Sequence, residues 1–162
     1  MNIQRIRIIG ATGSGKTYLA KAICDYTDYV CLNLDKIYFK YLVDGKPQYY
    51  TEQYRFDSLH CFLKYEKWII EGSYYQNWAI SSFEQADLIL VLNIPRYIRN
   101  CRVIKRSIQK HYSLEALIRH LKYSYLWEKN HKEKVFETLE SFHQKVRVVN
   151  SFKEAIRLIN PA

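Results

Sequence analysis

The chain has 162 residues, of which 48% are hydrophobic and 25% are charged. These values suit one globular domain and exclude a low-complexity or collagen-like chain, because it contains only 5 Gly and 3 Pro. No stretch approaches the ~20 consecutive apolar residues of a membrane-spanning helix, and the first residues show no secretory signal. We therefore expect a soluble, cytoplasmic protein.

The formal net charge is +9, and it is unevenly distributed. Residues 96–134 hold 11 Lys or Arg against three Glu, so this segment carries +8 of the +9. Such a basic segment suits nucleic acid, the phosphates of a nucleotide, or only a solvated helix face. Charge alone does not choose among these three interpretations.

The apolar pattern changes repeatedly between strand-like and helix-like spacing. In chain order, the expected elements are a strand at 3–9, a helix at 16–25, a strand at 29–34, a loop at Gly45 and Pro47, a helix from Thr51 to Leu63, strands at 68–70 and 87–93, an interrupted helical segment at 96–142, a strand at 146–149 and a helix at 152–159. This alternation predicts an α/β fold with a five-stranded parallel sheet flanked by helices.

The four cysteines are Cys24, Cys31, Cys61 and Cys101. They are scattered along the chain, without the C-x-x-C spacing of a zinc or redox motif. We expect all four to be reduced, buried and inert.

One motif with chemical meaning lies between the first strand and the first helix. Residues 10–17, GATGSGKT, match the phosphate-binding pattern G-x-x-x-x-G-K-[ST] at every fixed position. In this context, backbone N–H groups and the positive end of the helix dipole converge on phosphate oxygens. Lys16 is expected to reach the β- and γ-phosphates, and the Thr17 hydroxyl is expected to ligate Mg²⁺. We therefore expect ATP and Mg²⁺ as cofactors, with the nucleotide held by Gly10, Thr12, Gly13, Ser14, Gly15, Lys16, Thr17 and Tyr18.

Several classes of protein share this motif. The N-K-x-D and D-x-x-G elements of GTPases are missing, and large motor or transporter ATPases need a longer chain. Five strands with a basic segment after the fourth favour the three-layer P-loop NTPase fold of small kinases related to adenylate kinase. In that interpretation residues 1–162 form one domain, residues 36–66 bind an acceptor, and residues 96–134 form a short helical lid that excludes water.

Five segments together resemble one branch of these proteins. They read IRIIGATGSGKTYLAKAI, LNLDKIYF, WIIEGSY, DLILVLNIPRYIRNCRVIKR and VRVVNSFKEAIRLI, and they cover nearly the whole chain. The chain is similar to the DNA topology modulation (FlaR-related) proteins, an adenylate-kinase-like P-loop family. The resemblance implies a phosphotransferase that acts on a small acceptor of the nucleoside or nucleotide type.

The resemblance also implies roles for two carboxylates. Asp35 follows the second strand at the carboxyl edge of the sheet, where it would position the acceptor hydroxyl or reach a Mg²⁺-bound water. Glu71 ends the third predicted strand and would meet the metal through water, while Gly72 and Tyr74 would shape the acceptor pocket. The alternative is that Asp35 only caps a helix and that Glu71 is a surface acid.

Basic residues recur on one face of the helix expected after Pro95. Arg99, Arg102, Arg106 and Lys110 lie at i, i+3, i+7 and i+11. The resemblance assigns contacts with adenine and phosphates to Arg102 and Arg106, where they would compensate charge during phosphoryl transfer. Arg119 is a weaker lid candidate, and the whole row suits a solvated face as well.

Two further questions stay open in the sequence. Tyr38, Phe39, Tyr41, Tyr49 and Tyr50 either line an acceptor pocket or cover an edge of the core. Aromatic and basic residues after Tyr112 also suit nucleic-acid binding, so the competing function is a nucleotide-dependent regulator of DNA or RNA. We expect a monomeric or weakly dimeric protein; the acceptor and the choice between ATP and GTP are not encoded in any motif.

Overall fold

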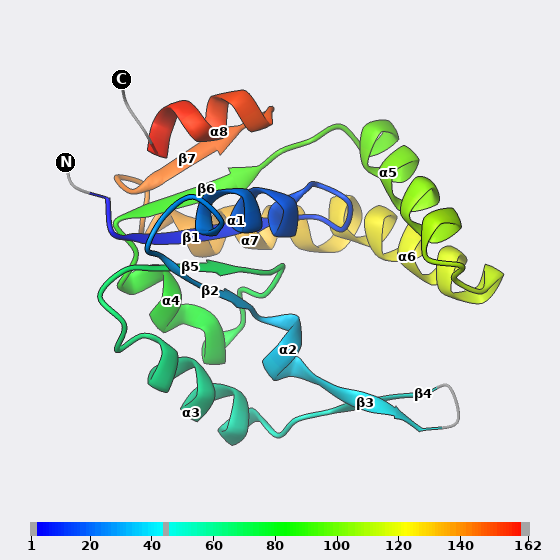
Figure 1. Ribbon diagram of the computed structural model, residues 1–162, viewed down its shortest axis with the longest axis horizontal. Coiled ribbons are helices and arrows are strands. Elements are labelled where there is room, and N and C mark those ends of the chain that lie inside the picture. Colours follow the sequence, from blue (N-terminus) through cyan, green and yellow to red (C-terminus); the bar gives the residue numbers. More distant parts are fainter. Residues whose placement is uncertain (1–2, 44–45, 160–162) are drawn as a thin grey trace.

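Five strands form one sheet with the order β2-β5-β1-β6-β7 (Figure 1). The computed structural model describes residues 3–43 and 46–159. The strands are β1 (Arg5–Gly10), β2 (Val30–Asn33), β5 (Trp68–Glu71), β6 (Leu88–Leu92) and β7 (Val146–Val149). All neighbouring strands run parallel, with β1 between β5 and β6. The predicted five-stranded parallel sheet is therefore confirmed.

Helical segments lie at the four places where the sequence predicted them, whereas the short helices at residues 35–38 and 80–84 were not predicted. The helices are α1 (Lys16–Cys24), α2 (Asp35–Tyr38), α3 (Glu52–Phe62), α4 (Ile80–Glu84), α5 (Arg96–Gln109), α6 (Leu114–Leu126), α7 (Lys132–Glu140) and α8 (Phe152–Ile159), with a 3-10 helix at Asn77–Ala79 and a π-helical turn at Trp127–His131. Thr51 caps α3 as its position predicts, because its hydroxyl accepts from the Tyr54 N–H at 3.2 Å. Among the helices of the described ranges, none combines the length and apolar character needed to cross a membrane.

Buried apolar side chains form two clusters, one on each face of the sheet. Side chains alternate along β1, so Ile6 and Ile8 join one cluster and Ile9 joins the other. Helices α1 and α8 cover the first face through Leu19, Ile23, Ala155 and Ile159. Helices α3, α4 and α7 cover the second through Leu59, Phe83, Val135 and Leu139. This three-layer packing fixes the carboxyl ends of the strands, where the candidate site lies.

An antiparallel hairpin of β3 (Phe39–Val43) and β4 (Lys46–Tyr49) was not predicted. The predicted loop residue Gly45 lies outside the described residues, whereas Pro47 lies in β4 and pairs with Leu42. Helices α5 and α6 form a second projection. Both projections extend beyond the carboxyl ends of the sheet strands (Figure 1).

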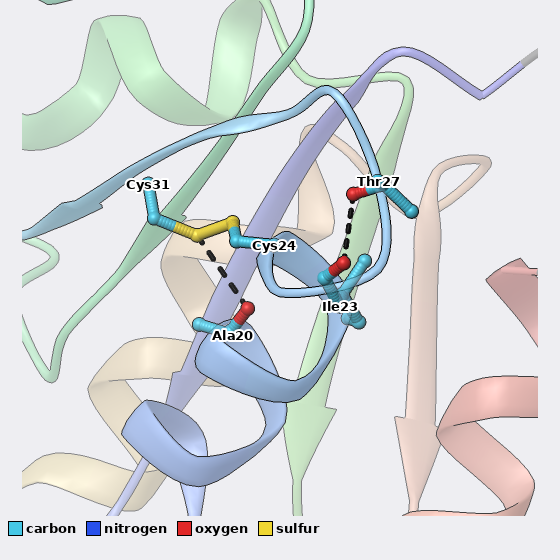
Figure 2. The surroundings of a disulfide bond; sticks show 5 residues. All are labelled: Ala20, Ile23, Cys24, Thr27 and Cys31. Atoms are coloured by element: carbon cyan, nitrogen blue, oxygen red, sulfur yellow. Dashed lines mark hydrogen bonds between the residues drawn. A yellow bond between two sulfur atoms is a disulfide. The ribbon is translucent and has the colours of Figure 1, made fainter.

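The expectation for the cysteines was wrong. Cys24 at the end of α1 and Cys31 in β2 form a disulfide, with their Cα atoms 6.5 Å apart. Figure 2 shows this bond beside the end of α1, where the Thr27 hydroxyl donates to the Ile23 carbonyl at 2.7 Å. The bond forms because α1 packs beside β2, a proximity that the spacing of the two cysteines does not reveal. The remaining thiols, Cys61 and Cys101, are exposed rather than buried.

Candidate active site

The loop between β1 and α1 has the geometry of a phosphate cradle. Gly15 precedes α1 with φ +99°, and no side chain caps the helix, so the N–H groups of its first turn remain available to a ligand. Gly13 has φ +80°, and a Cβ there would lie 2.6 Å from the carbonyl oxygen of Arg99 in α5. Glycine is therefore required at position 13 both by the backbone conformation and by the close approach of α5.

Lys16 folds back over this loop. Its Nζ donates to the carbonyl oxygens of Gly10 and Ala11, both at 2.9 Å. Burial lowers the pKa of the Lys16 ammonium to about 8, although the carboxylates of Glu71 and Asp35 oppose the shift. A polyphosphate would supply the negative charge that this site lacks.

Thr17 and Glu71 bring two oxygen donors together. The Thr17 hydroxyl donates to Glu71 Oε1 at 2.8 Å, and Glu71 ends β5 with 3% of its surface exposed. Burial raises the pKa of Glu71, while Lys16 and the hydrogen bond from Thr17 oppose the rise. Mg²⁺ prefers oxygen ligands and accepts one or two protein groups together with phosphates and water. The Thr17–Glu71 pair fits that requirement, and the alternative of Glu71 as a surface acid is wrong.

Asp35 lies at the first turn of α2, after β2. Its carboxylate is exposed and accepts from the Tyr74 hydroxyl at 2.8 Å, rather than contacting Thr17. Burial raises the pKa of that hydroxyl, and the charge of Asp35 raises it further. Gly72 allows the chain to pass close to β2, because a Cβ there would lie 2.9 Å from the Leu34 Cβ. The structure thus brings Asp35 and Tyr74 together beside the loop that carries Lys16.

Sequence reasoning missed Arg7. This arginine of β1 is fully buried, and its guanidinium reaches the segment after β5. It donates to the carbonyl oxygens of Gly72 at 3.2 Å and Tyr74 at 2.8 Å, and to the Ser82 hydroxyl at 3.0 Å. Ser73 in the same segment donates to the Gly10 carbonyl at 2.8 Å. Arg7 therefore holds the loop that links Tyr74 to the phosphate cradle.

The basic row of α5 divides into different environments. Arg102 Nη1 donates to the Ser14 carbonyl at 2.9 Å, so this side chain lies on the cradle. Arg106 lies near enough for its charge to contribute to the lowered pKa of Lys16. No hydrogen bond or ion pair holds the Arg106 guanidinium among the described residues, and its Nε is buried.

Arg99 departs from the predicted row. Only 1% of it is exposed, and its Nη2 pairs with Glu128 of the π-helical turn at 2.5 Å. Its Nη1 donates to the Ser124 carbonyl in α6 at 3.4 Å. The Arg99 side chain thus joins α5 to α6 and the π-helical turn, although its carbonyl oxygen approaches Gly13 of the cradle.

A cavity of about 280 Å³ opens beside the cradle. Arg102, Tyr18, Ser151 and Phe152 lie among its lining residues, and the rings of Tyr18 and Phe152 are 5.3 Å apart. Tyr18 was predicted from the sequence to contact the nucleotide, whereas Phe152 was not. A flat heterocycle joined to a polyphosphate in the cradle would find aromatic faces here.

The aromatic residues after Asp35 form a cluster around Tyr38. Its ring contacts those of Phe39, Tyr49, Tyr74 and Trp78, at centroid distances from 4.6 to 6.2 Å. Burial raises the pKa of Tyr49, Tyr123 of α6 raises it further, and the charge of Arg119 opposes the rise. Tyr123 and Arg119 of α6 therefore lie near Tyr49 of the β3–β4 hairpin.

Comparison with known proteins supports the fold. No protein-family model and no curated protein matches this chain. The structure of shikimate kinase from Acinetobacter baumannii in complex with shikimate aligns with a TM-score of 0.60 and 12% identity, over 97% of this chain and 93% of that chain. Deoxyadenosine kinase from M. mycoides with bound dATP gives 0.56 and 19%, over 96% of both chains. A gluconokinase from Sinorhizobium meliloti 1021 gives 0.55 and 15%, over 96% and 89%.

The chain therefore has the α/β fold of P-loop kinases, as predicted. At these identities the likeness shows the fold alone. The narrower resemblance to DNA topology modulation proteins finds no support in these comparisons.

Proposed function

We propose that this chain is an ATP-dependent phosphotransferase that moves the γ-phosphoryl group of Mg-ATP to a small-molecule acceptor. One observation carries the proposal: Lys16, the Thr17–Glu71 pair and Asp35 meet at the carboxyl ends of adjacent strands. Ligands of open α/β sheets bind at this edge. The shared fold of small-molecule kinases adds to the support.

In this proposal the cradle holds the β- and γ-phosphates, and the cavity at Tyr18 and Phe152 takes the base. Lys16 would exchange its two carbonyl partners for phosphate oxygens. Thr17 and Glu71 would hold Mg²⁺, which neutralises charge on the phosphates when bound. Arg102 and Arg106 would compensate the charge that spreads over the transferred group.

Asp35 would act on the acceptor. Its exposed carboxylate accepts a hydroxyl proton while the acceptor oxygen bonds to the γ-phosphorus, and the bond from that phosphorus to the bridging oxygen of ADP breaks. Tyr74 orients the carboxylate through its 2.8 Å hydrogen bond. A positioned base of this kind contributes about 10²- to 10⁴-fold to the rate.

Two variants test the proposal in complementary ways. Lys16→Ala should weaken binding of a nonhydrolysable ATP analogue in calorimetry. Asp35→Asn should preserve that binding but reduce acceptor-dependent ADP release by about 10²-fold or more. Unchanged nucleotide affinity in Lys16→Ala, or unchanged ADP release in Asp35→Asn, would contradict the assignment of that residue.

A further inference from the structure

Arg55 of α3 is a half-buried cation without an acidic partner. Its guanidinium lies over the Tyr38 ring, 4.1 Å from the centroid, and its Nη2 donates to the Tyr50 carbonyl at 2.6 Å. Its Nε is buried and has no hydrogen-bond partner in the described part of the chain. The ion pairs found among residues 3–43 and 46–159 do not include Arg55.

The aromatic cluster around Tyr38 connects Arg55 to Asp35, the carboxylate proposed to act on the acceptor. The Tyr38 ring lies 4.6 Å from the Tyr74 ring, and the Tyr74 hydroxyl donates to Asp35. Burial raises the pKa of Tyr74, and the positive charge of Arg55 partly offsets this rise, which places that charge near the hydroxyl. Asp35 and Arg55 thus both lie near Tyr74.

The Arg55 guanidinium recovers only part of the interaction energy that it loses when water is removed from it. Partial burial removes water from a guanidinium, and an aromatic face with one carbonyl oxygen returns only some of the lost interaction. Arginine presents a planar fork of donors that matches a carboxylate or a phosphate in two parallel hydrogen bonds. Nη1 of Arg55 has no hydrogen-bond partner among the described residues, and its guanidinium lies over the Tyr38 ring.

We propose that Arg55 forms an anion subsite within the acceptor site, so that the acceptor carries a carboxylate or phosphate in addition to the hydroxyl presented to Asp35. This proposal rests on the phosphotransferase function proposed above and narrows its substrate class. Sugar acids, sugar phosphates and nucleoside monophosphates belong to that class. Neutral sugars and nucleosides do not.

The test uses acceptors in matched pairs that differ only in the anionic group. Each sugar acid and each sugar phosphate is assayed beside the parent sugar, and each nucleoside monophosphate beside its nucleoside, by ADP release from Mg-ATP. The wild-type chain should favour the anionic member in kcat/KM. Arg55→Gln should raise the KM of that member about 10- to 100-fold, with little change in kcat or in the KM of Mg-ATP.

Three controls separate a binding role from a structural one. Arg55→Lys keeps the charge and should restore part of the affinity. Arg157→Gln removes an exposed arginine of α8 and should leave all constants unchanged. Thermal unfolding of each variant reports whether the fold survives. The carboxylate and phosphate pairs show which of the two anions Arg55 receives.

Calorimetry with the same anions distinguishes failure of this proposal from failure of the proposed function. If no compound stimulates ADP release, the transfer function fails; anion binding by the wild type that is lost in Arg55→Gln still supports the subsite. Preference for neutral acceptors overturns the subsite. So does an equal effect of Arg55→Gln on both members of a pair, or the lack of binding by every anion.

Discussion

Opposing influences bring the pKa of Lys16 close to physiological pH. Burial and the positive charges of Arg7 and Arg106 lower the pKa of the ammonium, and the nearby carboxylates only partly restore it, so that it stands at about 8. Phosphate binding would favour the charged form. On the proposed function, binding of a nucleotide above pH 8 should therefore be accompanied by uptake of a proton.

The first prediction concerns this linkage. Between pH 8 and 9.5 the affinity for Mg-ATP should fall by up to about tenfold per pH unit, because an increasing share of Lys16 is neutral before binding. Calorimetry in buffers of different ionisation enthalpy measures the proton uptake directly. Lys16→Arg is the matched control, since its charge persists through this range. Burial also lowers the pKa of Arg7, to about 9, but Arg7 is common to both proteins. Equal pH dependence in both would contradict the prediction.

Arg7 supports the second prediction at this scale. Arg7→Met should lower the free energy of unfolding by about 3 kcal/mol, because the carbonyl oxygens of Gly72 and Tyr74 would lose a buried donor. Urea unfolding measures the change. Ser82→Ala removes one contact of the same guanidinium and should cost about 1 kcal/mol. If Arg7→Met were no more harmful than Ser82→Ala, the role assigned to Arg7 would be wrong.

The sequence revealed the residues of the phosphate-binding motif, but it did not reveal residues whose partners lie far away in the chain. Lys16 and Thr17 belong to a contiguous motif whose chemistry follows from local spacing. Arg7 lies in the same segment, but its partners at Gly72 and Ser82 are more than 60 residues away, so nothing near it in the chain indicates a buried role. Phe152 was missed for the same reason, because its partner Tyr18 lies at the other end of the chain.

At the scale of elements, the disulfide fastens the end of α1 to β2. The bond closes a loop with a sequence separation of 7. Since α1 begins at the cradle and β2 leads to Asp35, the bond joins the two elements that carry these parts of the site. A loop of this length constrains the unfolded chain by about 2–3 kcal/mol in the chain-entropy model.

The third prediction follows from that loop. Cys31→Ser should lower the free energy of unfolding by about 2–3 kcal/mol, measured in urea without reductant, whereas Cys61→Ser should change little. Alkylation of the denatured, unreduced protein should modify Cys61 and Cys101 alone. Modification of all four cysteines would show that the bond is absent.

The sequence predicted the central elements better than the peripheral ones. The strands of the sheet are short apolar runs, most clearly in β6, because both faces are covered by helices. The strands β3 and β4 pair only with each other among the described residues. The sequence of β4 includes Lys46 and Pro47, which weaken a strand pattern. Helices α5 and α6 are separated at residues 110–113 by a turn in which His111 has φ +50°. The apolar pattern of the sequence does not mark this turn.

At the scale of the whole molecule, several cations of the basic segment, residues 96–134, are not free in solvent. Arg99 is buried against Glu128, and Arg102 donates to the cradle. Arg106 lies near Lys16, and Arg119 near Tyr49. Several of these cations thus surround the carboxyl edge of the sheet, where they suit a compact polyphosphate better than an extended duplex.

The fourth prediction compares these two ligands. Binding of a fluorescent DNA duplex, followed by anisotropy, should be weak (Kd about 10⁻⁴–10⁻⁶ M) and should weaken steeply between 50 and 200 mM salt, as expected for non-specific contacts. Mg-ATP affinity should change much less over the same range. Tight duplex binding that resists salt would instead favour the nucleic-acid function.

The cavity beside the cradle is lined by residues that are synthesised at different times. Ser14 and Tyr18 are made soon after β1, whereas Ser151 and Phe152 are made only after β7. A nascent polypeptide that has left the ribosome only as far as α7 carries the complete glycine-rich loop but just part of the surrounding wall. A complete wall around this cavity therefore requires synthesis of the chain through Phe152.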